Sequence, residues 1–444
     1  MRSKNFFFVA LSALSFALAL FAPAYFFWLT FFFLIPIFYG ARTENSNYSF
    51  TTGFLWGFIF FSVHLVPVTI LIVNDCFGWF RFIFPVILIC YSALHTGIWF
   101  TLAFRKKSFL RFVFYTWLFF WWVPRGLLWA SGAYIGYPLM YPLLPLAEYP
   151  QFLAAVRFFG TEFLLLFLIC FSMSSAFFLR TKNKKTFFLP IIFLTPFLIG
   201  FVLPHKEKEL PDFFKTFAHV APPDIPDGTP ALDVAQEIYY RIRRLLKQHP
   251  EVRYIVMPEL SCRFALNERQ DVIDLWTHNA LGDQVGLLIG ACKKKDENIF
   301  NSFYFIQQGR VQQVHDKTCL MPFAEYVSKI YRIFSFTKKL FLNGAICFTP
   351  GTKNVHFWFK EGHSCKNYIC AEALFAKKKY SNLLSDNDFL LSIFNDALFS
   401  NSFHHLFVLW VKLQGLKQNK VALFVGRKFA CLFTPGGKEQ SIYF

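Results

Sequence analysis

Charged residues are scarce in this chain, and their scarcity excludes an ordinary soluble protein. Only 16% of the 444 residues are Asp, Glu, Lys or Arg, whereas a soluble globular protein averages about 25%. The chain is instead 55% hydrophobic and 21% aromatic, with 64 Phe residues, most of which precede residue 205. This composition predicts an integral membrane protein with a more polar second half.

Cys-x-x-Cys pairs are absent among the ten cysteines, and without them a zinc or iron–sulfur cage is not expected. Cys90 and Cys170 lie inside apolar segments, where a cysteine usually serves only packing. The spacing indicates no disulfide framework, and Cys365 and Cys370 could form at most a local bridge. We therefore expect neither a metal site nor a cofactor.

Acidic residues are also few, since 27 Asp and Glu oppose 45 Lys and Arg and leave a formal net charge of +18. A basic balance can indicate nucleic-acid binding, but no basic helix with interleaved aromatic residues occurs here. Inner loops of membrane proteins are rich in Lys and Arg, and basic patches attract anionic lipid head groups. We therefore expect a membrane as partner and no nucleic acid.

Seven apolar segments occupy the first half of the chain, and most approach the roughly 20 residues that a helix needs to cross a bilayer. They cover residues 6–22, 25–40, 51–74, 81–104, 112–130, 160–179 and 187–203. The first resembles a signal peptide, because Arg2 and Lys4 precede it. A second long apolar run follows at once, which favours a retained helical hairpin.

Basic residues predict the orientation of these segments through the positive-inside rule. With a cytoplasmic N-terminus, the predicted outer loops before residue 205 carry only Arg81, Arg125 and Arg157, and the other basic residues of this half lie inside. Residues 131–159 then form an outer loop rich in Tyr and Pro, which suits the head-group zone. We expect a transmembrane domain over 1–205 with seven crossings, in the inner membrane of a bacterium, and a periplasmic domain over 206–444.

The second half alternates short apolar runs with helical patterns, which is typical of an α/β domain with mixed sheets. The strands are expected over 213–220, 254–257, 285–290, 301–306, 311–315, 355–359, 368–370, 389–394, 421–425 and 430–433. The helices are expected over 231–248, 271–280 and 403–416.

Three chemically useful side chains stand at or just after expected strand ends: Glu259, Lys317 and Cys370. A thiol nucleophile needs a base to remove its proton and a cation to hold the oxyanion that it creates. Considered singly, each residue has a plainer interpretation, because most buried cysteines only pack and most Glu and Lys side chains lie at the surface. Their order along the chain gives the three a combined meaning.

The residues around these three resemble the motifs of the nitrilase superfamily. Met257-Pro258-Glu259-Leu260 resembles its glutamate motif, and Asp316-Lys317, after Asn301-Ser302 and a hairpin at Gln308-Gly309, resembles its lysine motif. Residues 368–372 resemble its nucleophile turn, and 395–397 its Asn-Asp after a strand. The resemblance implies a Glu–Lys–Cys triad on an α-β-β-α sandwich.

Within that superfamily, the chain resembles the apolipoprotein N-acyltransferase family, which joins such a domain to several membrane helices. The stretch Leu320-Met321-Pro322-Phe323-Ala324-Glu325-Tyr326-Val327 resembles that family's Leu-Val-Pro-Phe-Gly-Glu-Tyr-Val. The resemblance implies that an acyl chain passes from a phospholipid to a cysteine thioester. It then passes to the α-amino group of the S-diacylglyceryl cysteine that begins an apolipoprotein.

The resemblance also implies a role for individual residues. Glu259 would be the base, Lys317 would hold the oxyanion and Cys370 would be the nucleophile. Glu325 would position the lysine, and Glu372 would orient the turn that carries the nucleophile. The acyl pocket would be lined by Phe323, Tyr326 and Leu374.

The sequence departs from the family pattern in several places. Ala371 stands where the family has Tyr, and Leu398-Phe399-Ser400 stands where it has Trp-Phe-Gly. The family's final transmembrane helix is not expected before Phe444. Two alternatives therefore stay open, a membrane-tethered nitrilase-type amidase and a scaffold that has lost its activity. A permease is disfavoured, because the apolar segments carry almost no internal charge.

Overall fold

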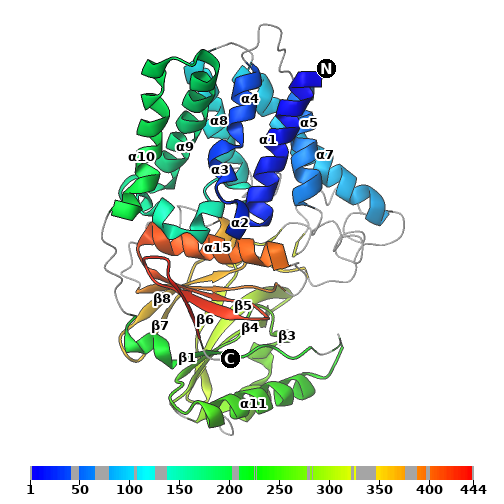
Figure 1. The fold of residues 1–444 in the computed structure, drawn as a ribbon. Coiled ribbons are helices and arrows are strands. Elements are labelled where there is room, and N and C mark those ends of the chain that lie inside the picture. Colours follow the sequence, from blue (N-terminus) through cyan, green and yellow to red (C-terminus); the bar gives the residue numbers. More distant parts are fainter. Residues whose placement is uncertain are drawn as a thin grey trace. The chain divides into compact units, whose positions relative to one another are not determined.

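The computed structural model describes residues 3–41, 50–65, 80–104, 108–125, 138–202, 210–224, 226, 228–277, 281–282, 284–321, 325–326, 347–375, 388–396 and 401–442. The chain forms two compact units (Figure 1). A helical unit comprises Met1–Lys206 and Phe399–Lys417, and an α/β unit comprises Glu207–Leu398 and Gln418–Phe444. The division into a membrane domain before residue 206 and a periplasmic domain after it stays a prediction.

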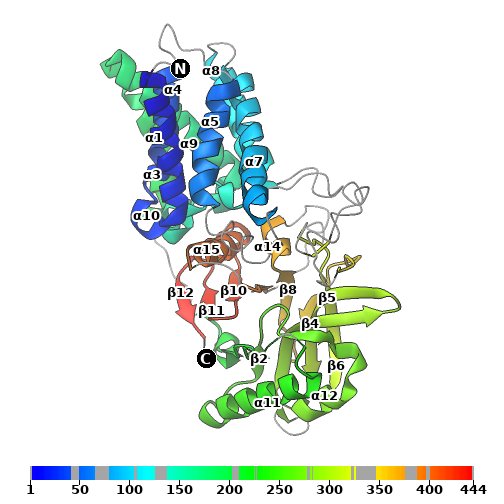
Figure 2. The ribbon, with the colours of Figure 1, turned by 90° about the vertical axis from the view of Figure 1, so that its right-hand side faces the viewer.

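The helical unit is built from apolar helices that run alongside one another (Figures 1 and 2). They are α1 (Ser3–Phe21), α2 (Pro23–Phe26), α3 (Leu29–Phe32), α4 (Leu34–Ala41), α5 (Phe50–His64), α7 (Phe80–Phe104), α8 (Phe109–Arg125), α9 (Val156–Thr181) and α10 (Phe188–Val202). Helix α15 (Asn401–Gln418) also groups with this unit, but it runs across the direction of these helices (Figure 1). The second expected segment, 25–40, is divided among three short helices. Short 3₁₀ turns, η2 (Pro138–Met140), η3 (Pro145–Glu148) and η4 (Pro150–Leu153), precede α9.

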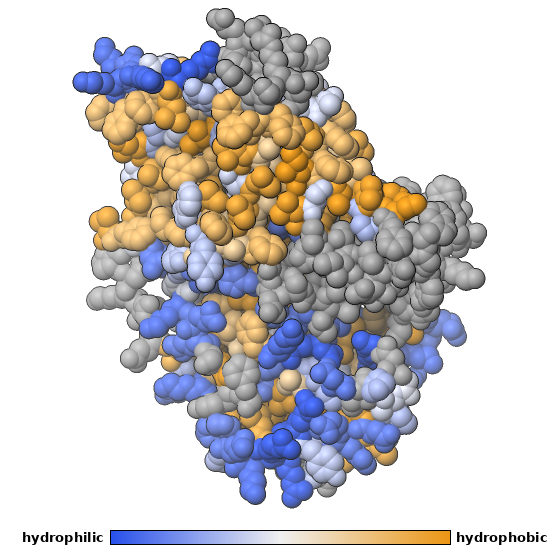
Figure 3. All heavy atoms as spheres, turned by 45° about the vertical axis from the view of Figure 1, so that its right-hand side comes forward, coloured by the Kyte–Doolittle hydropathy of each residue, from blue (hydrophilic) through white to orange (hydrophobic). Residues whose placement is uncertain are grey.

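On the face shown in Figure 3, apolar side chains cover much of the helical unit, whereas hydrophilic residues predominate on the α/β unit. Among the described residues, Pro85–Phe104, Val156–Thr181 and Lys184–Val202 are long and apolar enough to cross a membrane. Phe6–Phe21, Leu29–Gly40 and Phe50–His64 are shorter apolar helices. The expected segments 51–74 and 112–130 extend beyond the described residues, so the number of crossings stays a prediction.

Helices α5 and α7 approach closely because α5 presents two glycines one turn apart. A Cβ atom at Gly57 would lie 2.0 Å from Thr96 Oγ1 and 2.9 Å from Ala93 Cα. At Gly53 the Thr96 hydroxyl donates to the carbonyl oxygen over 2.8 Å. Small residues spaced in this way let helix backbones meet in an apolar environment, where packing replaces the hydrophobic effect as the driving force.

The first sheet of the α/β unit has the order β1-β2-β4-β5-β6, with β3 paired to β4. Its strands are β1 (Phe217–His219), β2 (Tyr254–Val256), β3 (Cys262–Ala265), β4 (Gly286–Lys295), β5 (Asn298–Gln307) and β6 (Arg310–Asp316). β1 pairs with β2 in parallel, and β2 and β3 each pair with β4 in parallel. β5 is antiparallel to β4, and β6 is antiparallel to β5. β6 therefore runs in the same direction as β4.

The second sheet has the order β12-β11-β10-β9-β8-β7. Its strands are β7 (His356–Trp358), β8 (Ser364–Ile369), β9 (Phe389–Ile393), β10 (Val421–Val425), β11 (Ala430–Phe433) and β12 (Glu439–Ser441). β8, β9 and β10 are parallel, with antiparallel strands on both sides. The short helix α14 (Ala371–Phe375) follows β8 directly, and α15 connects β9 to β10 along the chain.

Strand alternation divides the apolar side chains of the first sheet between two cores. Leu288, Phe303 and Phe305 point toward the second sheet and join its apolar residues in one cluster. Tyr304 and Ile306 point the other way, toward α11 (Ala231–Gln248) and α12 (Gln270–Trp276). Figure 2 shows these two helices on one side of the first sheet. The unit thus stacks a helix layer and two sheets.

Most expected strands and helices of this unit are present, and helix 231–248 has the expected bounds. The strand expected over 213–220 is wrong in its first half, because Asp212–Thr216 is a 3₁₀ turn and only Phe217–His219 is a strand. The turn allows the adjacent Phe213 and Phe214 both to pack into the core between the sheets, whereas in a strand they would point to opposite faces. Strands β3 and β12 were not expected.

The α5–α7 contact gives a test of the helical unit. We expect Gly57→Leu to lower the thermal unfolding midpoint in detergent, because the larger side chain must push α7 away from α5. Steric overpacking typically costs about 1–3 kcal/mol. Phe58→Leu is the matched control, since Phe58 is exposed on the same helix. An unfolding midpoint for Gly57→Leu equal to that of the control would contradict the packing described here.

Candidate active site

Four strand ends place polar groups in one region of the α/β unit. Glu259 follows β2, and Lys317 follows β6, which ends at the same edge of the first sheet because β6 and β4 run in one direction. Cys370 follows β8 and Asn395 follows β9, its parallel neighbour in the second sheet. The carboxyl ends of parallel strands are the usual location of ligand sites in α/β folds.

The carboxylate of Glu259 is buried and accepts three hydrogen bonds. Its Oε1 accepts from Lys317 Nζ over 2.7 Å and from Asn301 Nδ2 over 2.8 Å. Its Oε2 accepts from the backbone N–H of Asn395 over 2.8 Å. The side chain is 3% exposed, so these three donors stand in for the water that it has lost.

The ammonium group of Lys317 lies between two carboxylates. Besides Glu259, it donates to Glu325 Oε1 over 2.9 Å, and Glu325 also accepts from Asn301 Nδ2 and from the Met321 N–H. Burial lowers the pKa of Lys317, but Glu259 and Glu325 outweigh burial and raise this pKa well above its ordinary value. Lys317 is therefore a permanent cation at physiological pH.

The pKa of Glu325 is raised above its ordinary value. Its burial and its repulsion by Glu259 raise the pKa of Glu325, although Lys317 acts in the opposite direction. Two carboxylates that share one cation leave an excess negative charge in a buried site. A proton on Glu325 would relieve that excess without disturbing the Lys317–Glu259 pair.

Cys370 stands at a strained turn between β8 and α14. Its φ is 47°, a left-handed value that residues other than glycine adopt uncommonly and that often marks functional sites. Burial, and then Glu259, raise the pKa of the Cys370 thiol well above its ordinary value, while Lys317 opposes them. The surroundings of Cys370 therefore favour the protonated thiol over the thiolate.

Glu372, two residues after Cys370, accepts hydrogen bonds from both sheets. Its Oε2 accepts from the Ile369 N–H and from His315 Nε2, each over 2.8 Å. Its Oε1 accepts from the backbone N–H and the hydroxyl of Thr318, over 2.7 and 2.6 Å. Burial raises the pKa of Glu372, but His315 and Thr318 outweigh burial and lower this pKa below its ordinary value.

Two glycines let the backbone approach the site from behind. A Cβ atom at Gly290 would lie 2.5 Å from the Pro258 carbonyl oxygen and 2.6 Å from Glu259 Cα. At Gly351 it would lie 2.3 Å from the Asp316 carbonyl oxygen, and the Gly351 N–H donates to the Lys317 carbonyl over 2.7 Å. These contacts hold the turns that carry Glu259 and Lys317.

The structure brings Glu259, Lys317 and Glu325 into hydrogen-bonding contact and places Cys370 close enough to interact electrostatically with all three. Of the residues expected to line an acyl pocket, Tyr326 packs against a small apolar cluster and Leu374 is buried. Phe323 lies outside the described residues. The lining of an acyl pocket therefore stays a prediction.

Sequence reasoning named Asn301 only as part of the lysine motif and missed its contacts with the two carboxylates, and it missed the buried side chain of His315 altogether. Asn301 bridges both carboxylates of the cluster, and His315 pairs with Glu372. The strand period could have indicated His315, which lies two residues before Lys317 and so on the same face. Asn301 gave no such signal, because its partners are 42 and 24 residues away.

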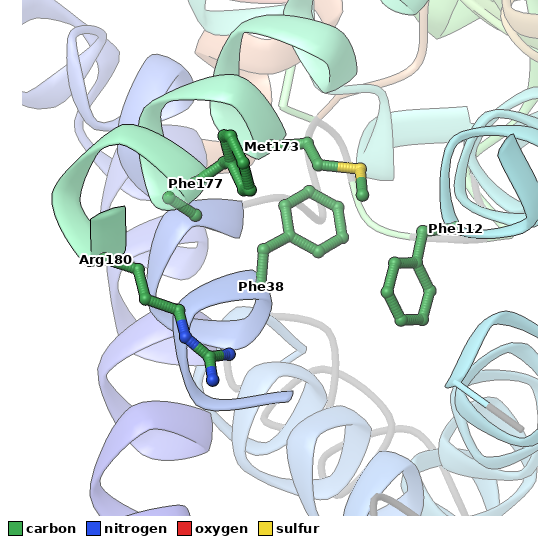
Figure 4. Close-up of a pocket in the computed structure, with 6 residues that line it drawn as sticks. Phe38, Phe112, Met173, Phe177 and Arg180 are labelled. Carbon is green, nitrogen blue, oxygen red and sulfur yellow. The ribbon is translucent and has the colours of Figure 1, made fainter. Parts of the chain in front are cut away.

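Figure 4 shows a separate hollow in the helical unit, formed by side chains of α4, α8 and α9. Its lining is Phe38, Phe112, Met173, Ala176, Phe177 and Arg180. This lining has one cation and no thiol or carboxylate, so this hollow does not contain the groups described above.

Comparison with known proteins gives partial relatives. Over 119 residues the chain is 28% identical to a protein from Wolinella succinogenes named apolipoprotein N-acyltransferase, covering 27% of this chain and 28% of that protein. Proteins of the same name from Allorhizobium ampelinum and Rhizobium rhizogenes are 28% and 27% identical over 34% and 33% of this chain. The chain resembles apolipoprotein N-acyltransferases. It spans 28–30% of the length of these curated relatives.

Solved structures with a similar chain path include members of the nitrilase superfamily. A carbon–nitrogen hydrolase from Helicobacter pylori covers 50% of this chain and 83% of its own, with 13% identity and a TM-score of 0.35. A Nesterenkonia amidase of that superfamily covers 54% and 89%, with 10% identity and a TM-score of 0.39. No protein-family model matches the chain.

The contact at Gly290 predicts that a single methyl group there disturbs the site. Gly290→Ala should push Glu259 away from Lys317 and slow alkylation of Cys370 by about tenfold or more, since displacements near 1 Å can cost that much. The rate is measured by mass spectrometry of the Cys370 peptide. Gly436→Ala is the matched control, because its Cβ would meet only Thr434 Oγ1 at 3.6 Å. Equal rates in the two variants would contradict this role of Gly290.

Glu372 predicts how stability depends on pH. Because the pKa of Glu372 is lower in the folded protein than its ordinary 4.5, its ionised form stabilises the fold above pH 4.5, and that contribution is lost as the pH falls through the folded pKa. At neutral pH, Glu372→Gln should lower the free energy of unfolding by about 2–3 kcal/mol and with it the thermal unfolding midpoint. The variant should also lose less stability than the wild type when the pH is lowered from neutral to acidic values.

The control for Glu372→Gln is Glu268→Gln, because the Glu268 side chain is 52% exposed. Thermal unfolding followed by tryptophan fluorescence at neutral pH and below pH 4.5 compares the two. A Glu372→Gln variant that lost stability in acid as steeply as the wild type would show that this carboxylate does not carry the effect.

Proposed function

We propose that this chain transfers an acyl chain from a phospholipid to the α-amino group of the N-terminal S-diacylglyceryl cysteine of apolipoproteins. The observation that carries the proposal is the buried Glu259–Lys317 pair, 2.7 Å apart, beside the strained Cys370. A base, a cation and a thiol are the three groups that acyl transfer through a thioester requires. The partial likeness to proteins named apolipoprotein N-acyltransferase supports the choice of substrates.

The hydrogen bonds of Glu259 indicate which oxygen takes the thiol proton. Oε1 already accepts from Lys317 and Asn301, which use both of its lone pairs. Oε2 accepts only from the Asn395 N–H among the described residues, so it retains a lone pair. We assign the proton of Cys370 to Oε2.

The first half of the reaction then follows from these assignments. The Cys370 sulfur attacks the carbonyl carbon of the phospholipid ester while its proton moves to Glu259. The ammonium of Lys317, with backbone N–H groups, stabilises the oxyanion of the tetrahedral intermediate. As the intermediate collapses, the carbon–oxygen bond breaks and the lysophospholipid leaves with the proton from Glu259. A thioester remains on Cys370.

In the second half, the α-amine of the apolipoprotein attacks the thioester carbonyl. Glu259 accepts a proton from this nitrogen and returns one to the departing sulfur, so an amide forms and the thiol of Cys370 is regenerated. One difficult transfer is thereby divided into two easier ones, with ping-pong kinetics. Glu325 would hold Lys317 in place throughout, and Glu372 would hold the turn that bears Cys370.

The helical unit supports a lipid donor. Many of its exposed side chains are apolar, and it has helices long enough to cross a bilayer (Figure 3). A protein embedded in a bilayer is surrounded by phospholipid, so the acyl donor is always close by. We propose the bacterial inner membrane as the location, with the α/β unit on the periplasmic side. Basic residues of the first half predict this orientation through the positive-inside rule.

The thioester gives the decisive test of this function. Purified protein is incubated with a vesicle of one defined phospholipid, and its intact mass is measured. We expect the wild type to gain one acyl chain that hydroxylamine removes, because hydroxylamine cleaves thioesters. Cys370→Ala should gain nothing, and Glu259→Gln should gain the acyl chain at least about a hundredfold more slowly, as for loss of a general base.

The acceptor is tested on the acylated protein. Adding a peptide that begins with S-diacylglyceryl cysteine should release the acyl chain onto the peptide amine, whereas the same peptide with an acetylated amine should not. If the acyl chain is released as free fatty acid with either peptide, water is the acceptor and the protein is a hydrolase rather than a transferase. Absence of any acyl adduct on the wild type would contradict the proposed function.

A further inference from the structure

The groups proposed to react come from different sheets. Glu259 and Lys317 follow strands of the first sheet, whereas Cys370 follows β8 of the second. Their spacing therefore depends on how one sheet is set on the other. The core between the sheets is apolar, and apolar attraction has no preferred direction. Directional contacts are needed to define the position of one sheet against the other.

Glu372 supplies such contacts. It stands on the second sheet's side, just after Cys370, and its carboxylate reaches Thr318 and His315 of the first sheet. All four of its hydrogen-bonding partners are donors, so the carboxylate has no room for a proton unless one donor is lost. The Ile369 N–H in turn ties the same carboxylate to the strand that presents the thiol.

His315 is the part of this link that the proposed chemistry does not use. It is fully buried, and strand alternation places it on the same face as Lys317. The intervening Asp316 turns to the other face, toward Ser302 and Lys293. The Val355 N–H donates to His315 Nδ1 over 3.3 Å, which assigns the ring hydrogen to Nε2, where it meets Glu372.

We propose that His315 is a positioning residue that acts through Glu372. Through the hydrogen on its Nε2, it holds the turn of Cys370 at the distance from Lys317 at which the ammonium stabilises a developing thiolate. His315 itself touches neither Cys370 nor Lys317 in the described contacts. Its part in thioester formation rests on the proposed function, but its effect on the reactivity of Cys370 does not.

The test measures the reactivity of Cys370 directly. Folded full-length protein is treated with iodoacetamide, and the rate of labelling is followed on the tryptic peptide 367–377, which contains Cys370 and no other cysteine. His315→Leu removes the donor to Glu372. His315→Gln retains one, because its amide nitrogen can occupy the place of Nε2.

The control separates positioning from loss of stability. Phe357 is fully buried in the core between the sheets and packs against Phe303, and it has no contact with Glu372 among those described. Phe357→Leu should therefore lower the unfolding temperature without affecting the link. Labelling of all variants is compared at a temperature well below each unfolding midpoint.

We expect His315→Leu to slow labelling of Cys370 by about tenfold, the usual size for a lost hydrogen bond to a buried charge. His315→Gln should recover most of the wild-type rate, and Phe357→Leu should retain it. Equal rates in His315→Leu and the wild type would overturn the proposal. So would a loss in Phe357→Leu as large as that in His315→Leu, a failure of Gln to restore the rate, or an unreactive Cys370 in the wild type.

This readout is independent of the acyl donor. If phospholipid leaves no acyl mass on the protein while the labelling rates follow the expected order, the proposed function fails and the positioning role stands. If acylation occurs and the labelling order is not observed, the function stands and His315 has no positioning role.

Discussion

The buried ammonium group of Lys317 sets the demands that its surroundings must meet. A charge removed from water costs several kcal/mol unless partners replace the lost hydration, and Lys317 is 1% exposed. Its partners, Glu259 and Glu325, are themselves buried and need further donors, which Asn301, the Asn395 N–H and the Met321 N–H supply. One cation thereby gathers segments that are up to 136 residues apart.

The same cluster also acts on the protonation of the Cys370 thiol. Burial and the two carboxylates keep Cys370 protonated, and Lys317 favours the thiolate only against them. In the proposed mechanism a base is needed when a substrate carbonyl is present, and Glu259 Oε2, which accepts only from the Asn395 N–H among the described residues, is assigned that role. A thiol that stays protonated at rest is also less prone to oxidation than an exposed thiolate.

Elements with a strong local pattern could be predicted from the sequence. The helix 231–248 has the expected bounds because its apolar residues recur at helical spacing, with Ala235, Ile238 and Ile242 buried. Patterns that tertiary packing overrides were predicted wrongly, as at Phe213 and Phe214, where a 3₁₀ turn buries two adjacent rings. The short strands β3 and β12 lie off the main sheet path or at its end, where little burial imposes alternation.

Composition and short-range periodicity were enough to predict the apolar first half, the α/β second half, and the strand-end location of Glu259, Lys317 and Cys370. Three features became evident only in the folded chain: Asn301 bridges two carboxylates, His315 meets Glu372 from the other sheet, and α15 groups with the helical unit. Buried charges need hydrogen-bond partners, and the fold supplies these from residues far apart in the chain. Because such partners have no regular spacing, the sequence shows no periodic pattern that would predict them.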